Sequence, residues 1–168
     1  ATSARERRHM KIVFGLGSNL GSRVALIAYG LDYLETMFGP GVRSRLYRSP
    51  AVAAPGASPG PDFINAAIAV QTDASAARVA DTIRHLEERA GRRRTTRWAN
   101  RTLDVDVLWA SGPMSGAGLE VPHPRLGVRD FALVPLEDVA PEAGLGGRRD
   151  HVTQVRLPRV QRSARRVE

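Results

Sequence analysis

The sequence contains no cysteine, and aromatic residues make up only 5% of it. Without cysteine there is no disulfide, no thiolate metal ligand and no cysteine nucleophile. The chain also lacks an apolar run approaching the roughly 20 residues of a membrane-spanning helix, and its arginine-rich start lacks the pattern of a secretory signal. We therefore expect a cytoplasmic protein that does not bind membranes.

Lysine is almost absent too, because Lys11 is the sole lysine among 25 basic residues. The net charge is +8, and six arginines gather between residues 89 and 101. Guanidinium groups are permanently charged and forked, which suits them to phosphate. A phosphate-bearing partner is therefore expected.

The 168 residues, 42% of them hydrophobic, predict a single domain over residues 1–168, with a core at about 11–141 and basic extensions at both ends. Predicted strands cover residues 11–17, 42–49, 63–72 and 101–109; predicted helices run from a cap at Ser18 or Asn19 to Gly39 and from a cap at Ser75 to Gly91. This β-α-β-β-α-β order predicts an α+β, ferredoxin-like sandwich, with a mainly antiparallel sheet and both helices on one face.

The remaining segments are less regular. A loop rich in proline and glycine is expected at residues 50–62, a turn at 111–118, and extended chain at 119–126. A helix is expected at 129–141 and a short strand at 152–157.

The stretch RTLDVDVLW, residues 101–109, alternates apolar and polar side chains. In a strand, Leu103, Val105, Val107 and Trp109 would share one face, and Thr102, Asp104 and Asp106 the other. The β-carbons of Asp104 and Asp106 would lie roughly 6.6 Å apart, on the same side.

Such a pair of carboxylates can bind Mg²⁺, which prefers oxygen ligands and often completes its shell with water and substrate phosphates. Two metals held in this way can neutralise charge on a transferred group and on its leaving group. Two acids on a solvated sheet face, paired with arginines, remain the alternative for the D-x-D pattern alone. The arginine-rich segment that leads into this strand favours a phosphate site.

Other residues give weaker signals. In the strand at 63–72, Ile64 and Ile68 would point to a core, while Phe63 and Asn65 would share the opposite, non-core face. The stretch GLGSNLG lacks the spacing of a phosphate loop, so Ser18 and Asn19 are interpreted as helix caps. His123 stands between two prolines near Arg125 and Arg129, where a phosphate contact is credible.

Five stretches in order along residues 12–141 carry a family resemblance: GLGSNLGSR, YRSPAV, DFINAAIAV, LEERAGRRRTTRWANRTLDVDVLW and VPHPRLGVRDFALVPLEDVAP. Together they resemble 6-hydroxymethyl-7,8-dihydropterin pyrophosphokinase, of folate biosynthesis. The resemblance implies the same fold and a reaction in which the hydroxymethyl oxygen of the pterin attacks the β-phosphorus of ATP and AMP leaves.

The resemblance also implies roles for individual residues. Two Mg²⁺ ions would bind Asp104 and Asp106, with Arg92 and Arg101 gripping the phosphates. Trp98 would lie in a loop that closes over them. ATP would further contact Glu87, Val107, Leu119, His123 and Arg129. The pterin would lie between Phe63 and Phe131, with its polar edge read by Asn65 and by the backbone near Ser49, Pro50 and Val52.

Two other functions stay open at this point. A basic ferredoxin-like domain can present its sheet to RNA, although the two acids and the scarcity of aromatic residues argue against it. A relative that binds neither ATP nor pterin is the other alternative. We expect an Mg²⁺-dependent enzyme that acts as a monomer or weak homodimer, without nucleic acid; no residue beyond the Asp pair suggests itself as the acceptor of the hydroxyl proton.

Overall fold

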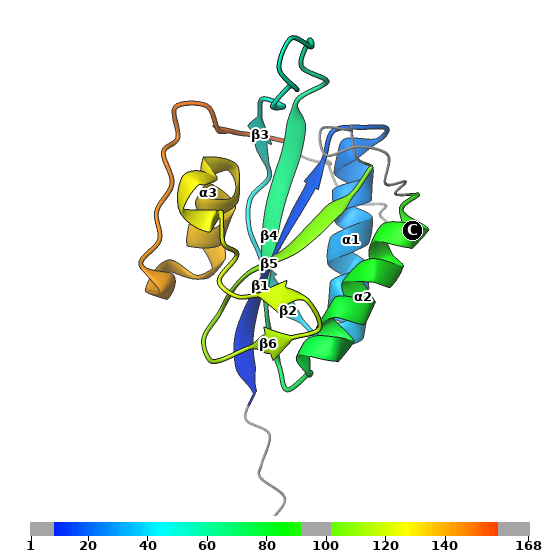
Figure 1. Ribbon diagram of the computed structural model, residues 1–168, viewed down its shortest axis with the longest axis vertical. Coiled ribbons are helices and arrows are strands. Elements are labelled where there is room, and N and C mark those ends of the chain that lie inside the picture. Colours follow the sequence, from blue (N-terminus) through cyan, green and yellow to red (C-terminus); the bar gives the residue numbers. More distant parts are fainter. Residues whose placement is uncertain (1–8, 92–101, 158–168) are drawn as a thin grey trace, which may run out of the picture.

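A six-stranded antiparallel sheet forms the centre of the computed structural model, which describes residues 9–91 and 102–157 (Figure 1). Its strands are β1 (Met10–Ser18), β2 (Gly41–Arg43), β3 (Tyr47–Ser49), β4 (Phe63–Thr72), β5 (Asp104–Ala110) and β8 (Thr153–Gln154). The order across the sheet is β5-β1-β4-β3-β8, with β2 also paired to β4. Hence the two longest strands lie at the centre and β5 lies at one edge.

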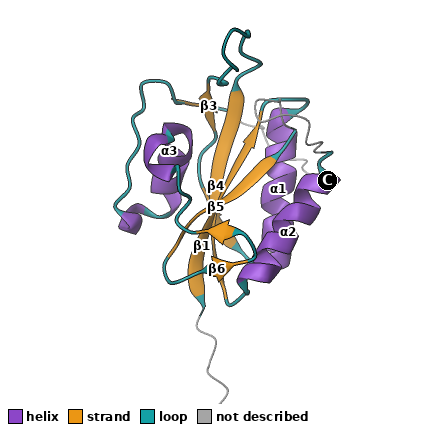
Figure 2. Cartoon of the chain, in the orientation of Figure 1, coloured by secondary structure: helices purple, strands orange, loops and turns teal. Residues whose placement is uncertain are grey.

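Three α-helices cover the two faces of the sheet unequally (Figure 2). Helices α1 (Arg23–Phe38) and α2 (Ala76–Arg89) pack on one face, and α3 (Asp130–Val139) packs on the other. The predicted α+β sandwich, with its first two helices on one face, is confirmed. No helix within the described residues is long and apolar enough to span a membrane.

Each face of the sheet has its own hydrophobic core, because alternate residues of the central strands point opposite ways. Ile12, Phe14 and Leu16 of β1 pack with α1 and α2. Val13 packs with Ala67 of β4 and with α3. The predicted non-core face of β4 is thus wrong: α3 buries it, and Asn65 is only 4% exposed.

A bulge corrects the prediction for Trp109. Val13 pairs with Trp109 and Phe14 pairs with Val107, so β5 has one extra residue, Leu108, at this point. Leu103, Val105 and Val107 pack in the core under α1 and α2, whereas Leu108 and Trp109 pack in the core under α3. Trp109 therefore does not share the face of Leu103.

Helix α1 begins later than predicted, at Arg23, and Ser18 and Asn19 do not cap it. The Ser18 hydroxyl donates to the carbonyl of Leu20, and the Asn19 amide donates to the carbonyl of Pro61. The second cap is correct, because the Ser75 hydroxyl accepts a hydrogen bond from the Arg78 backbone N–H. Gly91, with φ of 81°, follows the end of α2 as predicted.

The other differences are local. The strand predicted at 42–49 is divided into β2 and β3. Between them, the backbone N–H of Ala67 donates to the Ser44 hydroxyl instead of to a backbone carbonyl. The predicted turn at 111–118 is part of a hairpin of β6 (Ser115–Gly116) and β7 (Leu119–Glu120). Short 3₁₀ helices occupy Leu126–Val128 and Pro141–Ala143, and the last predicted strand shortens to β8.

Candidate active site

Asp104 and Asp106 share one face of β5, as the alternation predicts. Asp104 pairs with Gly17 and Asp106 pairs with Gly15 on β1. Directly paired residues lie on the same face of a sheet, so both acids have a glycine beside them; the Leu108 side chain packs over Gly15, and Asn65 and Phe63 lie against Gly17. The side chain of Asp106 is 38% exposed, although it lies on a strand of the central sheet.

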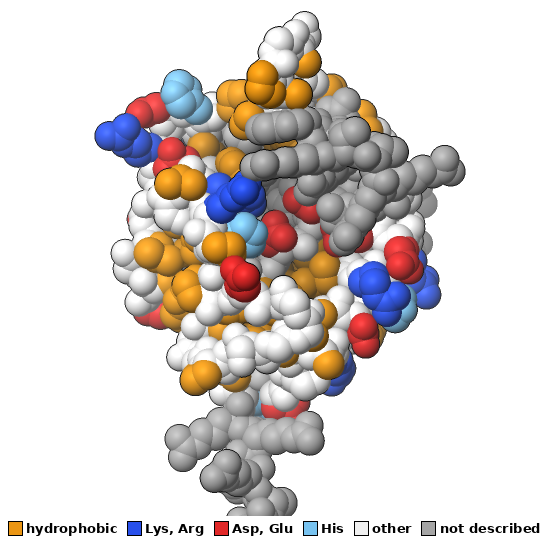
Figure 3. Space-filling view, viewed as in Figure 1, with side chains coloured by type: hydrophobic (Ala, Val, Ile, Leu, Met, Phe, Trp, Pro, Cys, Tyr) orange, Lys and Arg blue, Asp and Glu red, His pale blue; other side chains and the backbone are white. Residues whose placement is uncertain are grey.

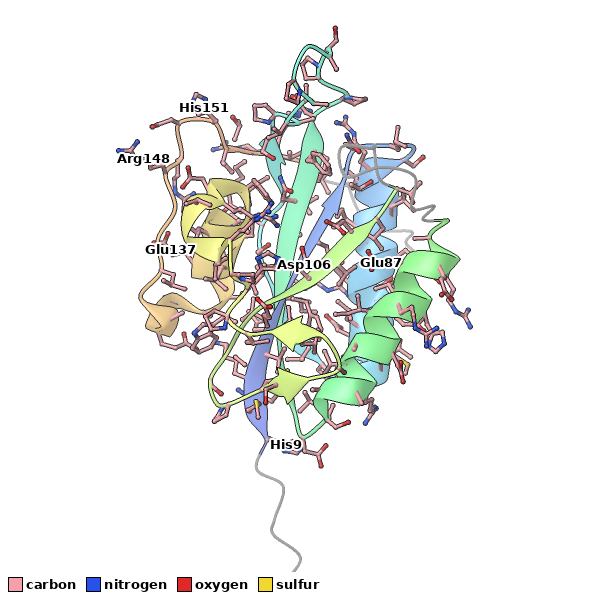
Figure 4. The ribbon with its side chains drawn as sticks, in the orientation of Figure 1. His9, Glu87, Asp106, Glu137, Arg148 and His151 are labelled. Atoms are coloured by element: carbon pink, nitrogen blue, oxygen red, sulfur yellow. The ribbon has the colours of Figure 1, made fainter. Side chains whose placement is uncertain are left out.

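A pocket of about 840 Å³ opens beside this edge strand, between α2 and the β6–β7 hairpin. In Figure 3, acidic side chains, a histidine and a basic side chain gather around an apolar patch on this face. Seven of the residues predicted to bind ATP or metal line the pocket: Glu87, Asp104, Asp106, Val107, Leu119, His123 and Arg129. Figure 4 shows Glu87 on the side of α2 that faces β5.

The backbone around His123 orients its imidazole ring. The backbone N–H of His123 donates to the carbonyl of Leu108 at 3.1 Å, which ties the segment to the bulge of β5. The Nδ1 atom of His123 accepts from the backbone N–H of Arg125 at 3.2 Å. In the neutral ring the proton is therefore on Nε2, which can donate to an anionic oxygen.

Arg129 lies between the acids and an aromatic ring. Its Nη1 is 4.0 Å from Oδ2 of Asp106, and its guanidinium carbon is 5.7 Å from the centre of the Phe131 ring. Arg129 directly precedes α3, and Phe131 is in the first turn of that helix. One end of α3 thus carries a residue predicted for ATP and a residue predicted for the pterin.

The residues predicted for the pterin do not line the 840 Å³ pocket. Three of them, Ser49, Phe63 and Asn65, lie on the same face of the sheet as the acids. Asn65 pairs with Gly17, which also pairs with Asp104, so the three residues form one row across β4, β1 and β5. The Asn65 amide donates to the Ser49 hydroxyl at 2.7 Å, and both residues are buried. Phe63, two residues before Asn65 in β4, pairs with Ser49.

Phe131 comes to this region from α3, which covers this face of the sheet. It packs against the cluster of Tyr47, Val134 and Val152. Tyr47 pairs directly with Asn65 across β3 and β4. Of the remaining predicted residues, Pro50 and Val52 are exposed, and Val52 is 68% exposed at the start of the loop at 50–62. Arg92, Trp98 and Arg101 lie outside the described residues.

Tyr47 is the buried ring that joins α3 to this region. Its hydroxyl donates to Oδ2 of Asp138 on α3 at 2.7 Å. The same oxygen accepts from the backbone N–H of Arg45 at 3.1 Å. Burial, followed by the hydrogen bond to Asp138, raises the pKa of Tyr47 above its ordinary value.

Sequence reasoning missed the two glycines that lie beside the acids. A β-carbon on Gly17 would be 3.3 Å from Oδ1 of Asn65 and 3.5 Å from the Phe63 ring, and one on Gly15 would be 2.8 Å from the side chain of Leu108. The signal was available, since the alternation of residues 11–17 already puts Gly15 and Gly17 on one face. Tyr47 and Asp138 had no such signal, because they are 91 residues apart.

Comparison with known proteins identifies the family of the chain. Residues 13–141 match the family model described as 7,8-dihydro-6-hydroxymethylpterin-pyrophosphokinase (HPPK). The 2-amino-4-hydroxy-6-hydroxymethyldihydropteridine pyrophosphokinase of Methylorubrum extorquens is 36% identical over 139 residues, which make up 79% of this chain and 84% of that protein. The protein of the same name from Pseudomonas aeruginosa is 34% identical over 140 residues, or 80% of this chain and 83% of that one.

The fold also resembles a solved structure titled "Crystal Structure Analysis of the HPPK-DHPS in complex with substrates". The TM-score is 0.56 and the identity 12%, over 80% of this chain and 41% of that one, so this match supports the fold alone. The family model and the curated relatives, each covering most of the chain, show that it belongs to the 7,8-dihydro-6-hydroxymethylpterin-pyrophosphokinase family.

Proposed function

We propose that this chain binds MgATP in the pocket beside β5, through Asp104 and Asp106, and passes the pyrophosphoryl group to a pterin held between Phe63 and Phe131. The reaction follows from the family, whose members transfer pyrophosphate from ATP to hydroxymethyldihydropterin in folate biosynthesis. The observation that carries the assignment of residues is the pocket itself, where two carboxylates meet a histidine and an arginine from later segments.

The chemistry of the two carboxylates fits magnesium. Within residues 9–91 and 102–157, no group of three or more His, Cys, Asp or Glu side chains could hold a metal ion. Two oxygen ligands from the protein, completed by water and phosphate, match the usual shell of Mg²⁺. Bound here, Mg²⁺ would supply positive charge beside the transferred phosphates and beside the leaving AMP.

The other side chains of the pocket would hold the nucleotide. Nε2 of His123 can donate to a phosphate oxygen, and the guanidinium of Arg129 can pair with another. Arg92 and Arg101, which lie outside the described residues, would have the same task, and Trp98, also outside them, would contact ATP. Glu87 on α2, together with Val107 and Leu119, would bind the remainder of the nucleotide.

The proposed reaction needs no nucleophile from the protein. The hydroxymethyl oxygen forms a bond to the β-phosphorus, the bond between that phosphorus and the oxygen bridging to the α-phosphorus breaks, and AMP leaves with that oxygen. The hydroxyl oxygen gives up its proton as the new bond forms. Alignment of the two substrates and stabilisation of charge on the phosphates would supply most of the acceleration.

The pterin would be held by stacking and by buried polar groups. Phe63 and Phe131 supply the rings, and the backbone near Ser49, Pro50 and Val52 supplies further contacts. The amide of Asn65, fixed by Ser49, would hydrogen-bond the polar edge of the pterin. A preorganised amide is an efficient recognition group, because little ordering is required when the ligand binds.

The surroundings of the reaction are also proposed. We infer an enzyme that works in the cytoplasm as a monomer or weak homodimer and binds neither nucleic acid nor membranes. Against nucleic acid, the support is the position of Asp104 and Asp106 on the sheet face that an RNA-binding domain would present, since two acids there repel a phosphate backbone.

The decisive experiment supplies MgATP and 6-hydroxymethyl-7,8-dihydropterin to the protein and identifies the nucleotide product by chromatography. We expect AMP and the pterin pyrophosphate in equal amounts, and no turnover when EDTA removes Mg²⁺. ADP as product would contradict the proposal. Salt-sensitive RNA binding without turnover would support the RNA-binding alternative instead.

A further inference from the structure

The segment between β1 and α1, residues 19–22, has polar side chains that the proposed function does not use. The sequence suggests helix caps here, yet Ser22, at the N-cap position of α1, makes no side-chain capping hydrogen bond. Asn19 is instead buried, with only 2% of its surface exposed. A buried amide is costly unless its polar groups are hydrogen-bonded, so its bonding partners are informative.

Asn19 and Arg23 reach across to the end of a different loop. Nδ2 of Asn19 donates to the carbonyl of Pro61 at 3.3 Å. Nη1 of Arg23 donates to the carbonyl of Asp62 at 2.6 Å. These two consecutive carbonyls are the last before β4. Asn19, which precedes α1, and Arg23, its first residue, therefore hold the point where the loop at 50–62 enters the sheet.

The first residue after this anchor is Phe63, the proposed stacking ring for the pterin. Backbone pairing between β1 and β4 begins directly after Phe63, where Ser18 pairs with Ile64 and Gly17 pairs with Asn65. A β-carbon on Gly17 would be 3.5 Å from the Phe63 ring, so this ring lies close against the end of β1. The direction in which the chain enters β4 therefore bears directly on where the ring stands.

The rest of the loop offers little to fix Phe63. Residues 50–62 form no helix or strand, and most of them are exposed (Figure 1). Proline and glycine are frequent in this stretch, PAVAAPGASPGPD. A loop without regular structure has many accessible conformations. The hydrogen bonds at its end therefore determine how far the first residues of the adjoining strand can move.

We propose that Asn19 and Arg23 are positioning residues for the pterin subsite: they hold the carbonyls of Pro61 and Asp62 and thereby set the place of Phe63. This inference rests on the proposed pterin site. Neither residue lines the nucleotide pocket. Loss of either hydrogen bond therefore weakens binding of the pterin and leaves binding of ATP unchanged.

The test compares Asn19→Asp and Arg23→Met with the wild type. Aspartate has nearly the shape of asparagine but no N–H to donate, and Arg23→Met keeps an unbranched apolar side chain without the guanidinium. We expect each variant to raise KM for the pterin about threefold to tenfold, the range for one lost hydrogen bond, with KM for ATP changed less than twofold. Ser22→Ala, in the same segment, is the matched control and should leave both constants unchanged.

A second measurement separates positioning from general loss of structure. Pterin binding to each variant is measured by calorimetry, and melting temperature by circular dichroism. Weaker pterin binding in Arg23→Met at an unchanged melting temperature supports the proposal, even if Asn19→Asp fails to fold. Equal increases in both KM values, or a lower melting temperature with unchanged pterin binding, would overturn it. A wild type that forms no AMP would instead refute the proposed function.

Discussion

The two substrate regions of this molecule are built in contrasting ways. The proposed nucleotide pocket lies at the open edge of the sheet and is lined by charged side chains from β5, α2 and the segments around His123 and Arg129. The proposed pterin region lies over the inner strands, where Asn65, Ser49 and Tyr47 are all buried. Charge is concentrated in the first region, and packing with hydrogen-bonded neutral groups in the second.

This difference has an energetic meaning. Partly exposed charges add little to the free energy of unfolding, so evolution or mutation can alter them with little effect on the fold. Removal of a hydrogen-bond partner from a buried polar group lowers the free energy of unfolding of the protein. Changes on the nucleotide side should therefore affect the reaction at constant stability, whereas changes on the pterin side should affect pterin binding and stability together.

The largest effect is expected from Asp106→Asn, which tests the first half of the comparison. The amide has almost the same shape as the carboxylate but lacks its charge, so metal binding and charge stabilisation should both be lost. We expect turnover to fall at least about a thousandfold, with the melting temperature within about 2 °C of wild type. Asp150→Asn, at an exposed site on the α3 side, is the control; comparable losses in both variants would contradict the metal role.

The next largest effect is expected from His123→Ala. Removal of the donor at Nε2 should raise KM for ATP about tenfold, the value of one hydrogen bond to a charged group, while KM for the pterin stays near wild type. Steady-state kinetics with each substrate varied in turn measures the split. An equal rise in both constants would show that the two regions are less separate than the structure indicates.

Gly17→Ala sharpens the comparison from the pterin side. The new β-carbon would approach Oδ1 of Asn65 to 3.3 Å and the Phe63 ring to 3.5 Å, so the amide must shift by a few tenths of an ångström. We expect KM for the pterin to rise a few-fold, by the loss of about 1 kcal/mol of binding free energy, while KM for ATP stays the same. Gly127→Ala, where an added β-carbon meets nothing within 4 Å, is the matched control.

The smallest effect on activity, but a measurable one on stability, is expected from Tyr47→Phe. Loss of the hydrogen bond to Asp138 should lower the free energy of unfolding by about 1 kcal/mol at pH 7. Since burial raises the folded-state pKa of Tyr47, this stabilisation should be fully present below the unfolded-state value of about 10 and decline as pH rises through the folded-state value. Urea unfolding of both proteins at pH 7 and pH 11 measures the change; a difference that is the same at both values would contradict it.

Much of the fold could be predicted from periodicity, because β1, β4, α1 and α2 carry apolar residues at regular spacing, whereas the segment at 42–49 does not and is divided into two short strands. The face shared by Asp104 and Asp106 follows from the same alternation. Trp109 could not be placed this way: the bulge at Leu108 resets the alternation, and the side chain of Leu108 packs over Gly15 on another strand. Local pattern contains no information about such a partner.

Parts of the site escaped prediction for the same physical reason. Asn19 is of a residue type that often caps helices, yet its amide donates to the carbonyl of Pro61, 42 residues away. The family resemblance predicted seven of the residues that line the pocket, and the structure brings these seven together. The roles of Arg92, Trp98 and Arg101, outside the described residues, stay predictions.

Arg129 contacts a residue of each proposed substrate region. Its guanidinium contacts both the Asp106 carboxylate and the Phe131 ring. A ligand that binds this guanidinium in place of Asp106 would therefore also change its contact with Phe131. A triphosphate in the nucleotide pocket would attract the Arg129 guanidinium away from Asp106. The surface around Phe131, where the pterin is proposed to bind, would then change. If binding of one substrate shifts this cation, thermodynamic reciprocity requires that each substrate change the affinity of the other by the same factor.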